Sequence, residues 1–145
     1  MSEQSGPAPR SLTTRELEQL LEDQQFGVLA TVKRNGHPAM STVLYRWSAA
    51  EQVIRISTTA DRLKARQIRN DPRVALHVRG DNVWSFAVAE GEAQVTDQPE
   101  ELLRFAGQVD DAAAFLEQQA REQRVIIKIP VSRLYGTALD ITPAP

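Results

Sequence analysis

The sequence predicts a mainly β protein, an antiparallel β-barrel with a few peripheral helices, and three observations lead to that prediction. Five strand-like segments follow one another early in the chain, in the order typical of a meander. A sixth returns late, after a stretch with helical spacing. Asn35–Gly36 marks a hairpin between the first two strands. This order favours an antiparallel barrel over a doubly wound parallel sheet.

The first element is expected to be a helix that follows a polar tail. Residues 1–10 are rich in Ser, Gly and Pro, which predicts a disordered tail ahead of a single domain over residues 11–145. Thr13 and Glu16 match a capping box, in which each side chain binds the other residue's backbone N–H. Apolar residues then recur at helical spacing: Leu17, Leu20 and Leu21. We therefore expect this helix to lie against the core.

Three strands come next. Period-two alternation begins at Phe26 and runs to Lys33. Asn35–Gly36 is a strong hairpin signal, because a type I′ turn needs positive φ at both central residues. The second strand is expected over residues 39–47 and the third over residues 53–57.

A basic helix follows the third strand and is expected to stop before Asp71–Pro72, because the residue before a proline disfavours helical conformation. The remaining elements are expected at residues 74–78 (strand), 83–96 (strand), 99–121 (helix, broken near 107–111) and 125–129 (strand). Gly91 predicts a bulge or a close backbone approach within the fifth strand. Pro130 is expected to end the last strand, where a missing donor is tolerated.

Composition excludes several classes of function. At 145 residues, with 41% hydrophobic and 25% charged residues, the chain has the size and composition of one ordinary globular domain. A net charge of -2 argues against a nucleic-acid partner. The absence of cysteine excludes disulfides and thiolate zinc sites, and two histidines forty residues apart predict no metal site. With no transmembrane-length apolar run and no signal core, we expect no membrane contact and a cytoplasmic location.

Several expected strands carry apolar residues on both faces, although a barrel interior accounts for only one face. Tyr45 lies on one face of its strand and Leu44 on the other. Phe86 likewise opposes Ala87 in a later strand. The outer apolar face needs a cover, either helices or another subunit, and we therefore expect a homodimer.

The junction between the third strand and the basic helix is a candidate anion site. Ser57 and Thr58 close the strand, and Arg62 and Lys64 open the helix. Hydroxyls, free N–H groups at a helix N-terminus and nearby cations together suit a phosphate. The alternative is an ordinary solvated basic helix. Twenty residues later an aromatic strand begins at Trp84 and could cover a flat ring, which suggests a planar cofactor with a phosphate.

Four segments, in this order, resemble the flavin- and deazaflavin-binding split β-barrel family that includes pyridoxamine 5′-phosphate oxidases. They are FGVLATVKRNGHPAMSTVLY from Phe26, ISTTADRLKARQIRNDPRVA from Ile56, WSFAVAEGEAQVT from Trp84 and IPVSRLYG from Ile129. The sequence is most similar to the actinobacterial branch that uses the deazaflavin coenzyme F-420. The resemblance implies a six-stranded antiparallel FMN-binding split barrel, homodimeric, with each cofactor in a groove between the two subunits.

The resemblance also implies a set of cofactor contacts. Four side chains would hold the phosphate: Ser57, Thr58, Arg62 and Lys64. The ring would run along four residues, mostly against their backbone: Ala39, Met40, Ser41 and Thr42. Two residues would come from the other subunit: Trp84 and Ser85. The chain departs from its relatives at positions 39 and 42, where they often carry amide side chains, and it lacks the C-terminal Arg/His motif of true pyridoxamine phosphate oxidases.

No acid, base or nucleophile can be assigned as catalytic, which is typical of hydride transfer, where the cofactor carries the chemistry. We expect an oxidoreductase that binds coenzyme F-420 at the dimer interface and passes a hydride to a conjugated planar acceptor of biliverdin, quinone or enone type. A helical wheel places Arg62, Arg66 and Arg69 on one face, which would suit the polyglutamate tail of F-420. The alternatives are an FMN-dependent oxidoreductase of the same fold and a non-catalytic flavin or deazaflavin carrier or sensor.

Overall fold

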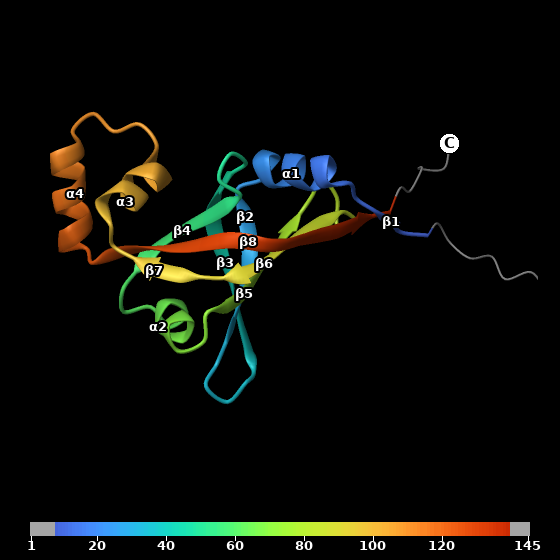
Figure 1. Cartoon of the computed structure of the whole chain (residues 1–145), viewed down its shortest axis with the longest axis horizontal. Coiled ribbons are helices and arrows are strands. Elements are labelled where there is room, and N and C mark those ends of the chain that lie inside the picture. Colours follow the sequence, from blue (N-terminus) through green and yellow to red (C-terminus); the bar gives the residue numbers. More distant parts are fainter. Residues whose placement is uncertain (1–7, 140–145) are drawn as a thin grey trace, which may run out of the picture.

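The computed structural model describes residues 8–139 and contains the closed six-stranded antiparallel barrel that the sequence predicts (Figure 1). The barrel strands are β2 (Phe26–Val32), β3 (Pro38–Ser48), β4 (Val53–Thr59), β5 (Arg73–Arg79), β6 (Phe86–Glu92) and β8 (Arg124–Ala138). Neighbours pair in the order β8-β4-β3-β2-β5-β6, and pairing of β6 with β8 closes the barrel. Closure leaves none of the six strands with a free edge along its whole length.

Two short strands and four helices surround the barrel. They are β1 (Arg10–Ser11), β7 (Gln94–Thr96), α1 (Thr14–Asp23), α2 (Leu63–Asn70), α3 (Pro99–Ala106) and α4 (Ala112–Arg121). Helices α3 and α4 lie at one end of the molecule and β1 at the other (Figure 1). The tail predicted over residues 1–10 falls mostly outside the described residues, and Arg10 pairs with Ala138 in β8. Within residues 8–139 no helix has the length and apolar character needed to cross a bilayer.

The prediction for the last strand was wrong in length: β8 continues nine residues beyond Ile129. Its first part pairs with β4 and its second part with β6. Pro130 lies where β8 changes partner, opposite Val53 at the start of β4, so its missing N–H is tolerated inside a long strand. The bulge predicted at Gly91 is confirmed, since the register of β6 against β8 shifts between Glu90 and Gly91.

The predicted fifth strand was also wrong, because it begins later and is divided in two. Val83 and Trp84 form a turn, β6 begins only at Phe86, and β7 is a separate strand that pairs with β8 at another part of its length. The Asn82 side chain accepts a hydrogen bond from the Trp84 backbone N–H at 2.8 Å, and the Gly80 N–H donates to the Ser85 carbonyl at 2.7 Å. The bond from the Trp84 N–H to the Asn82 side chain competes with strand formation, because Asn side chains readily bind the backbone two residues on.

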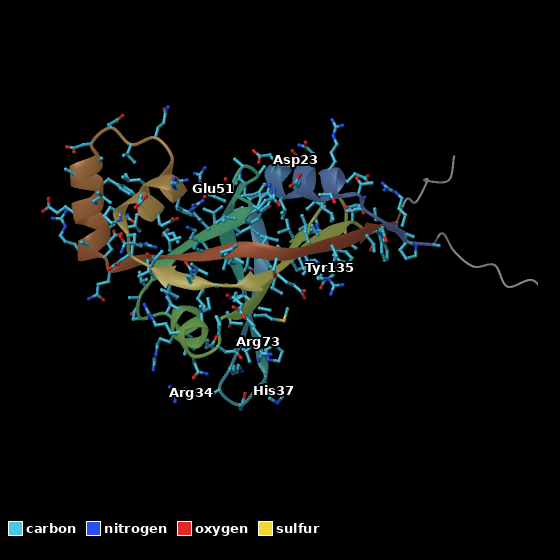
Figure 2. The ribbon with its side chains drawn as sticks, viewed as in Figure 1. Asp23, Arg34, His37, Glu51, Arg73 and Tyr135 are labelled. Carbon is cyan, nitrogen blue, oxygen red and sulfur yellow. The ribbon has the colours of Figure 1, made fainter. Side chains whose placement is uncertain are left out.

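The hairpin predicted between the first two strands joins β2 and β3, but its turn is not type I′. Gly36 has a φ of 87°, whereas Asn35 does not have a positive φ. The Gly36 N–H donates to the Lys33 carbonyl at 2.9 Å, and the Lys33 N–H donates to the His37 carbonyl at 2.8 Å. A type I turn followed by a left-handed glycine explains this pattern. Arg34 and His37 lie at the tip of the hairpin, which projects from the barrel (Figure 2).

The helices begin and break where the sequence predicts. The capping box of α1 is present: the Thr13 N–H donates to Glu16 Oε1 at 3.0 Å, and the Glu16 N–H donates to Thr13 Oγ1 at 3.2 Å. The Tyr45 hydroxyl donates to the Leu21 carbonyl at 2.7 Å and ties α1 to the barrel. Burial of this phenol raises the pKa of Tyr45, and the charges of Glu22 and Asp23 raise it further. The predicted break between α3 and α4 is confirmed.

A charged cluster attaches α3 to the outside of the barrel. Arg55 on β4 has a side chain only 5% exposed and lies 2.6 Å from both Glu51 and Glu101. Lys128 on β8 contacts Glu101 at 2.8 Å, and Arg104 pairs with Glu51. Figure 2 shows Glu51 on the side of the barrel that faces α3. This cluster explains why β4 is buried on both faces although an arginine lies in it.

Candidate functional site

Two adjoining cavities, of about 380 and 280 Å³, form a cleft between β3, the end of β4 and α2. Arg62 and Lys64 line both cavities, and we call the combined space the α2 cleft. The structure brings eight of the ten residues predicted for the cofactor to this cleft. The larger cavity holds Ala39, Met40 and Ser41, and the smaller holds Thr42, Ser57 and Thr58.

The chain between β4 and α2 gives the smaller cavity its polar wall. Strand β4 continues two residues beyond its predicted end, so Ser57 and Thr58 belong to the strand itself. The Thr59 hydroxyl donates to Asp61 at 2.6 Å, a bond that holds the pKa of this carboxyl below its ordinary value. The Arg62 N–H donates to the Thr59 carbonyl, which closes the turn into the helix.

The N-terminus of α2 has unpaired backbone donors. Arg62 occupies the N-cap position and makes no side-chain capping bond, and the first turn contains no acidic residue. The first N–H groups of a helix have no partner within the helix, and the helix dipole places partial positive charge there. An anion at this end would therefore meet both backbone donors and a favourable field.

Lys64 is a half-buried cation that lines both cavities of the cleft. Over residues 8–139 neither Lys64 nor Arg62 takes part in an ion pair or a side-chain hydrogen bond. Partial burial lowers the pKa of the Lys64 ammonium, and the neighbouring charge of Arg62 lowers it further. A desolvated cation beside a second cation is unfavourable until an anion arrives. Lys33, Arg62, Lys64 and Arg124 outnumber the one carboxylate that lines the cleft, Asp61, so the cleft carries local positive charge in a chain of net charge -2.

The larger cavity contains two residues that the sequence reasoning missed. Thr31 on β2 is 3% exposed, and its hydroxyl donates to the Gln67 Oε1 atom at 2.6 Å. Gln67 is half-buried and lines the cavity beside Ala39 and Met40. The available signal was its spacing, because Gln67 follows Lys64 by three residues and so shares a face of α2 with it.

The arginine stripe predicted on α2 does not line the cleft as a whole. Only Arg62 does so; Arg66 is exposed, and Arg69 donates to the Ala60 carbonyl at 3.3 Å. The cations that adjoin Lys64 are instead Lys33 at the larger cavity and Arg124 at the smaller one. Arg124 is paired with Glu122 at 3.2 Å.

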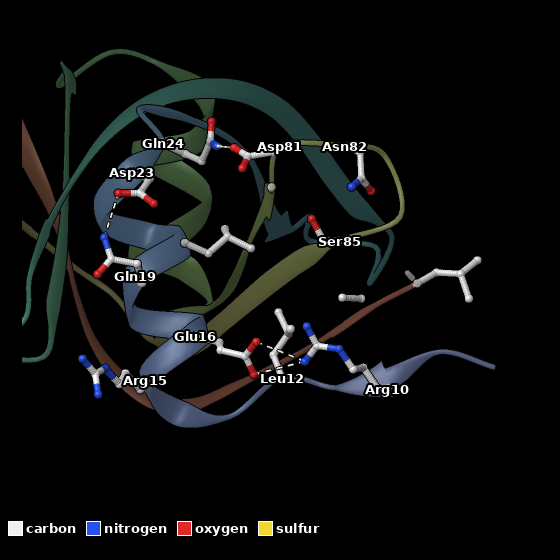
Figure 3. Close-up of a pocket in the computed structure, with 14 residues that line it drawn as sticks. Arg10, Leu12, Arg15, Glu16, Gln19, Asp23, Gln24, Asp81, Asn82 and Ser85 are labelled. Atoms are coloured by element: carbon white, nitrogen blue, oxygen red, sulfur yellow. Dashed lines mark hydrogen bonds and ion pairs between the residues drawn. The ribbon is translucent and has the colours of Figure 1, made fainter. Parts of the chain in front are cut away.

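Trp84 and Ser85 do not reach the α2 cleft of their own chain. Trp84 is 52% exposed on the turn between β5 and β6. Ser85 lines a separate cavity of about 560 Å³ beside α1 (Figure 3). Most of the charged groups of that cavity have a polar partner, as Arg10 has in Glu16 at 3.1 Å and Asp23 in Gln19 at 2.8 Å, whereas Arg15 has none among the described residues. Ser85 is the one hydroxyl side chain that lines this cavity in the described chain, whereas a cluster of hydroxyl groups lines the smaller cavity of the α2 cleft beside Lys64.

The cleft is suited to binding rather than to acid–base chemistry by protein groups. Across the described chain, no group of three or more His, Asp or Glu side chains is placed to hold a metal ion. One end of the cleft offers hydroxyls, helix N–H groups and cations. The other end offers Ala39, Met40 and Ser41 of β3, in a part of the strand that pairs with β2 and not with β4. A ligand with a phosphate at one end and a flat group at the other fits both halves.

Comparison with known proteins agrees with this fold. The sequence model of the family described as pyridoxamine 5′-phosphate oxidase matches residues 13–138. Among solved structures, a conserved hypothetical protein from Mycobacterium tuberculosis is 21% identical, with a TM-score of 0.74 over 100% of this chain and 98% of that chain. A protein named F-420 reductase is 27% identical, with a TM-score of 0.60 over 81% of this chain and 94% of that one. An FAD-binding protein from Mesorhizobium loti is 19% identical, with a TM-score of 0.70 over 91% and 99%.

Proposed function

Because the chain belongs to the pyridoxamine 5′-phosphate oxidase family, we propose that it is an oxidoreductase that binds coenzyme F-420 in the α2 cleft and reduces a conjugated planar acceptor. The observation that carries the proposal is the uncompensated charge of Lys64 beside Ser57 and Thr58, at the N-terminus of α2. The 27% identity to a protein named F-420 reductase supports deazaflavin as the ring. Acceptors of biliverdin, quinone or enone type remain the expected class.

Different residues of the cleft bind different parts of the cofactor. Lys64 and Arg62 neutralise the phosphate, and the hydroxyls of Ser57 and Thr58 orient it. Small side chains at Ala39 and Ser41 let a flat ring approach the backbone of β3. The bound cofactor supplies the hydride, and the protein supplies position, charge and exclusion of water.

A second subunit would complete the site. Met40 and Leu44 line the cleft yet are 68% and 43% exposed, and Phe26, which pairs with Leu44 across the strands, is 62% exposed. Exposed apolar side chains of this size on one face are typical of an interface. We propose a homodimer in which the partner covers this face and brings its own Trp84 and Ser85 to the ring, as the sequence resemblance implies.

FMN remains the second candidate for the cofactor. The observation that favours it is the position of the arginine stripe, since Arg66 and Arg69 do not line the cleft and are not placed to hold a long acidic tail. A hydroxyl-and-lysine phosphate site serves FMN as well as F-420. Comparison with an FAD-binding protein, at 19% identity, supports only the fold.

The test is a titration of the purified protein with F-420 and, separately, with FMN, followed by tryptophan fluorescence. We expect tighter binding and stronger quenching with F-420. Tighter binding of FMN would indicate a flavin-dependent enzyme. If neither F-420 nor FMN changes the tryptophan fluorescence, the proposal is contradicted. A single-turnover assay with reduced cofactor and a panel of acceptors then separates an enzyme from a carrier. If no acceptor is reduced faster than without protein, the result counts against an enzyme and favours a carrier.

Replacing Trp84 by alanine should weaken cofactor binding about tenfold and shift the protein toward monomer, because an aromatic anchor at a shared interface contributes to both. Fluorescence titration and analytical ultracentrifugation measure the two effects. Trp47→Phe is the matched control: Trp47 is half-buried, does not line the cleft, and its buried Nε1 atom has no hydrogen-bond partner in the described chain. A Trp84→Ala monomer with unchanged affinity would rule out a shared site.

A further inference from the structure

The larger cavity of the α2 cleft contains an amide whose orientation is set by a buried hydroxyl. Gln67 projects from α2 beside Ala39 and Met40 of β3. Thr31 lies on the neighbouring strand β2, directly opposite Ala39 in the sheet. Its hydroxyl donates to the Gln67 Oε1 atom at 2.6 Å, and Thr31 itself is 3% exposed. The barrel wall therefore holds one end of the amide.

The other end of the amide is left without a partner. Because Oε1 accepts from Thr31, the two N–H groups on Nε2 remain as donors, and they bond no group within residues 8–139. Gln67 is half-exposed and lines the cavity, and its Nε2 atom is not buried, so these donors are accessible from the cavity. A ligand oxygen in the cavity can therefore accept from them.

The position of Gln67 relative to Lys64 fits a ligand that extends along β3. The two residues are three apart on α2, which separates them by about 4.5 Å along the helix axis. Lys64 lines both cavities, whereas Gln67 lines only the larger one. A phosphate at Lys64 and Ser57 therefore leaves Gln67 beside the part of the ligand farther from the phosphate.

We propose that Gln67, positioned by Thr31, is the specificity-determining donor that binds a carbonyl oxygen on the edge of the cofactor ring. This inference rests on the proposed function, in which a flavin or deazaflavin lies along β3. Both ring systems carry carbonyl oxygens on the pyrimidine end. Ala39 and Thr42 bring no amide to this edge, and Gln67 supplies one from the opposite wall of the cleft. The cleft thus selects rings with a carbonyl edge.

Gln67→Leu tests the proposal, because it keeps the size of the side chain and removes the donor. We expect the Kd for the cofactor to rise about five- to tenfold, as for the loss of one hydrogen bond. The absorption maximum of the bound cofactor should shift, because its ring loses a hydrogen bond. Thr31→Val, which keeps the amide and removes the hydroxyl that holds it, should shift the same maximum and raise the Kd about two- to threefold.

Inorganic phosphate is the probe for the other end of the cleft. Its inhibition constant for cofactor binding should be unchanged in Gln67→Leu, since phosphate does not reach the ring edge. Gln94→Leu, at an exposed position on β7 outside the cleft, should change neither constant.

The possible outcomes separate this inference from the proposed function. If the wild-type protein binds neither cofactor, both fail. If the wild type binds but Gln67→Leu has the same Kd and spectrum, only the assignment of Gln67 fails. If Gln67→Leu weakens the binding of cofactor and of inorganic phosphate by the same factor, Gln67 supports the cleft as a whole. That result would also overturn the assignment of Gln67 to the ring edge.

Discussion

Replacing Glu101 by alanine should lower the free energy of unfolding by about 3 kcal/mol, the lower end of the range for breaking a buried ion pair. The change removes the partner of two cations at once, Arg55 at 2.6 Å and Lys128 at 2.8 Å. Arg55 is only 5% exposed, so it keeps a desolvated charge with Glu51 as its one remaining ion-pair partner among residues 8–139. Urea denaturation measures the loss, and the slope should stay unchanged if only stability is altered.

Arg55→Met is the matched control for this cluster. Methionine fills similar volume without charge, while Glu101 keeps Lys128 and Glu51 keeps Arg104. We expect a loss of about 1 kcal/mol, because a buried ion pair replaced by an apolar side chain often costs little. An equal or larger loss for Arg55→Met would show that the cost arises from packing rather than from an unpaired charge.

Acid titration of the wild type gives a second check on the cluster. Burial alone raises the pKa of Glu101, but the hydrogen bonds from Arg55 and Lys128 outweigh it and hold this pKa below its ordinary value of 4.5. A carboxyl with a lowered pKa in the folded state stabilises fully above 4.5, and the stabilisation is lost as pH falls from 4.5 through the folded pKa. We expect the Glu101→Ala protein to lose less stability than the wild type over this interval.

Replacing Lys64 by alanine should weaken cofactor binding by about 1.5–3 kcal/mol, the usual contribution of a hydrogen bond to a charged group. Lys64 lines both cavities of the cleft and pairs with no carboxylate in the described chain, so its ammonium is available to a phosphate. Fluorescence titration with F-420 and with FMN measures the loss. An unchanged Kd would show that Lys64 does not contact the cofactor.

Arg66→Ala is the control, because it removes the same charge from an exposed position of α2 outside the cleft. It should change the affinity by less than about twofold, as screened surface charges usually do. Equal effects of the two variants would mean that the general field of α2 attracts the ligand and that Lys64 makes no specific contact.

The affinity should also depend on pH through Lys64. Burial and the charge of Arg62 hold the pKa of the free Lys64 ammonium below its ordinary value of 10.5. Binding of a phosphate favours the charged form, so affinity is highest below this pKa and falls as pH rises through it. The Lys64→Ala protein should lack this decrease, which isothermal titration at several pH values can measure.

Much of the fold could be predicted because its signals are local. The capping box of α1 depends on Thr13 and Glu16, three residues apart, and the strands depend on alternation within a few residues. The hairpin was placed correctly, but its turn type was not, because Gly36 alone supplies the positive φ. The turn at Val83 and Trp84 was missed since its composition resembles a strand and one Asn82 side-chain bond decides against it.

The candidate site was predictable in part for the same reason. Ser57 to Lys64 form one continuous segment, so their meeting at a helix N-terminus follows from the order of elements. The residues of β3 could be added only through the resemblance to a family. Gln67 was missed, because its significance lies in a bond to Thr31, 36 residues away.

The sequence by itself determined the mainly β class, the order of the strands, the helix start signals and the basic junction after β4, because each depends on neighbours along the chain. Only the tertiary structure decided the length of β8, which pairs with β4 and β6 in turn, and the position of Arg55 within a carboxylate cluster. The tertiary structure also decided which cations of α2 line the cleft. It decided as well that a hydrogen bond from Thr31 holds Gln67 beside those cations. These features depend on contacts between distant segments, which form only when the barrel closes.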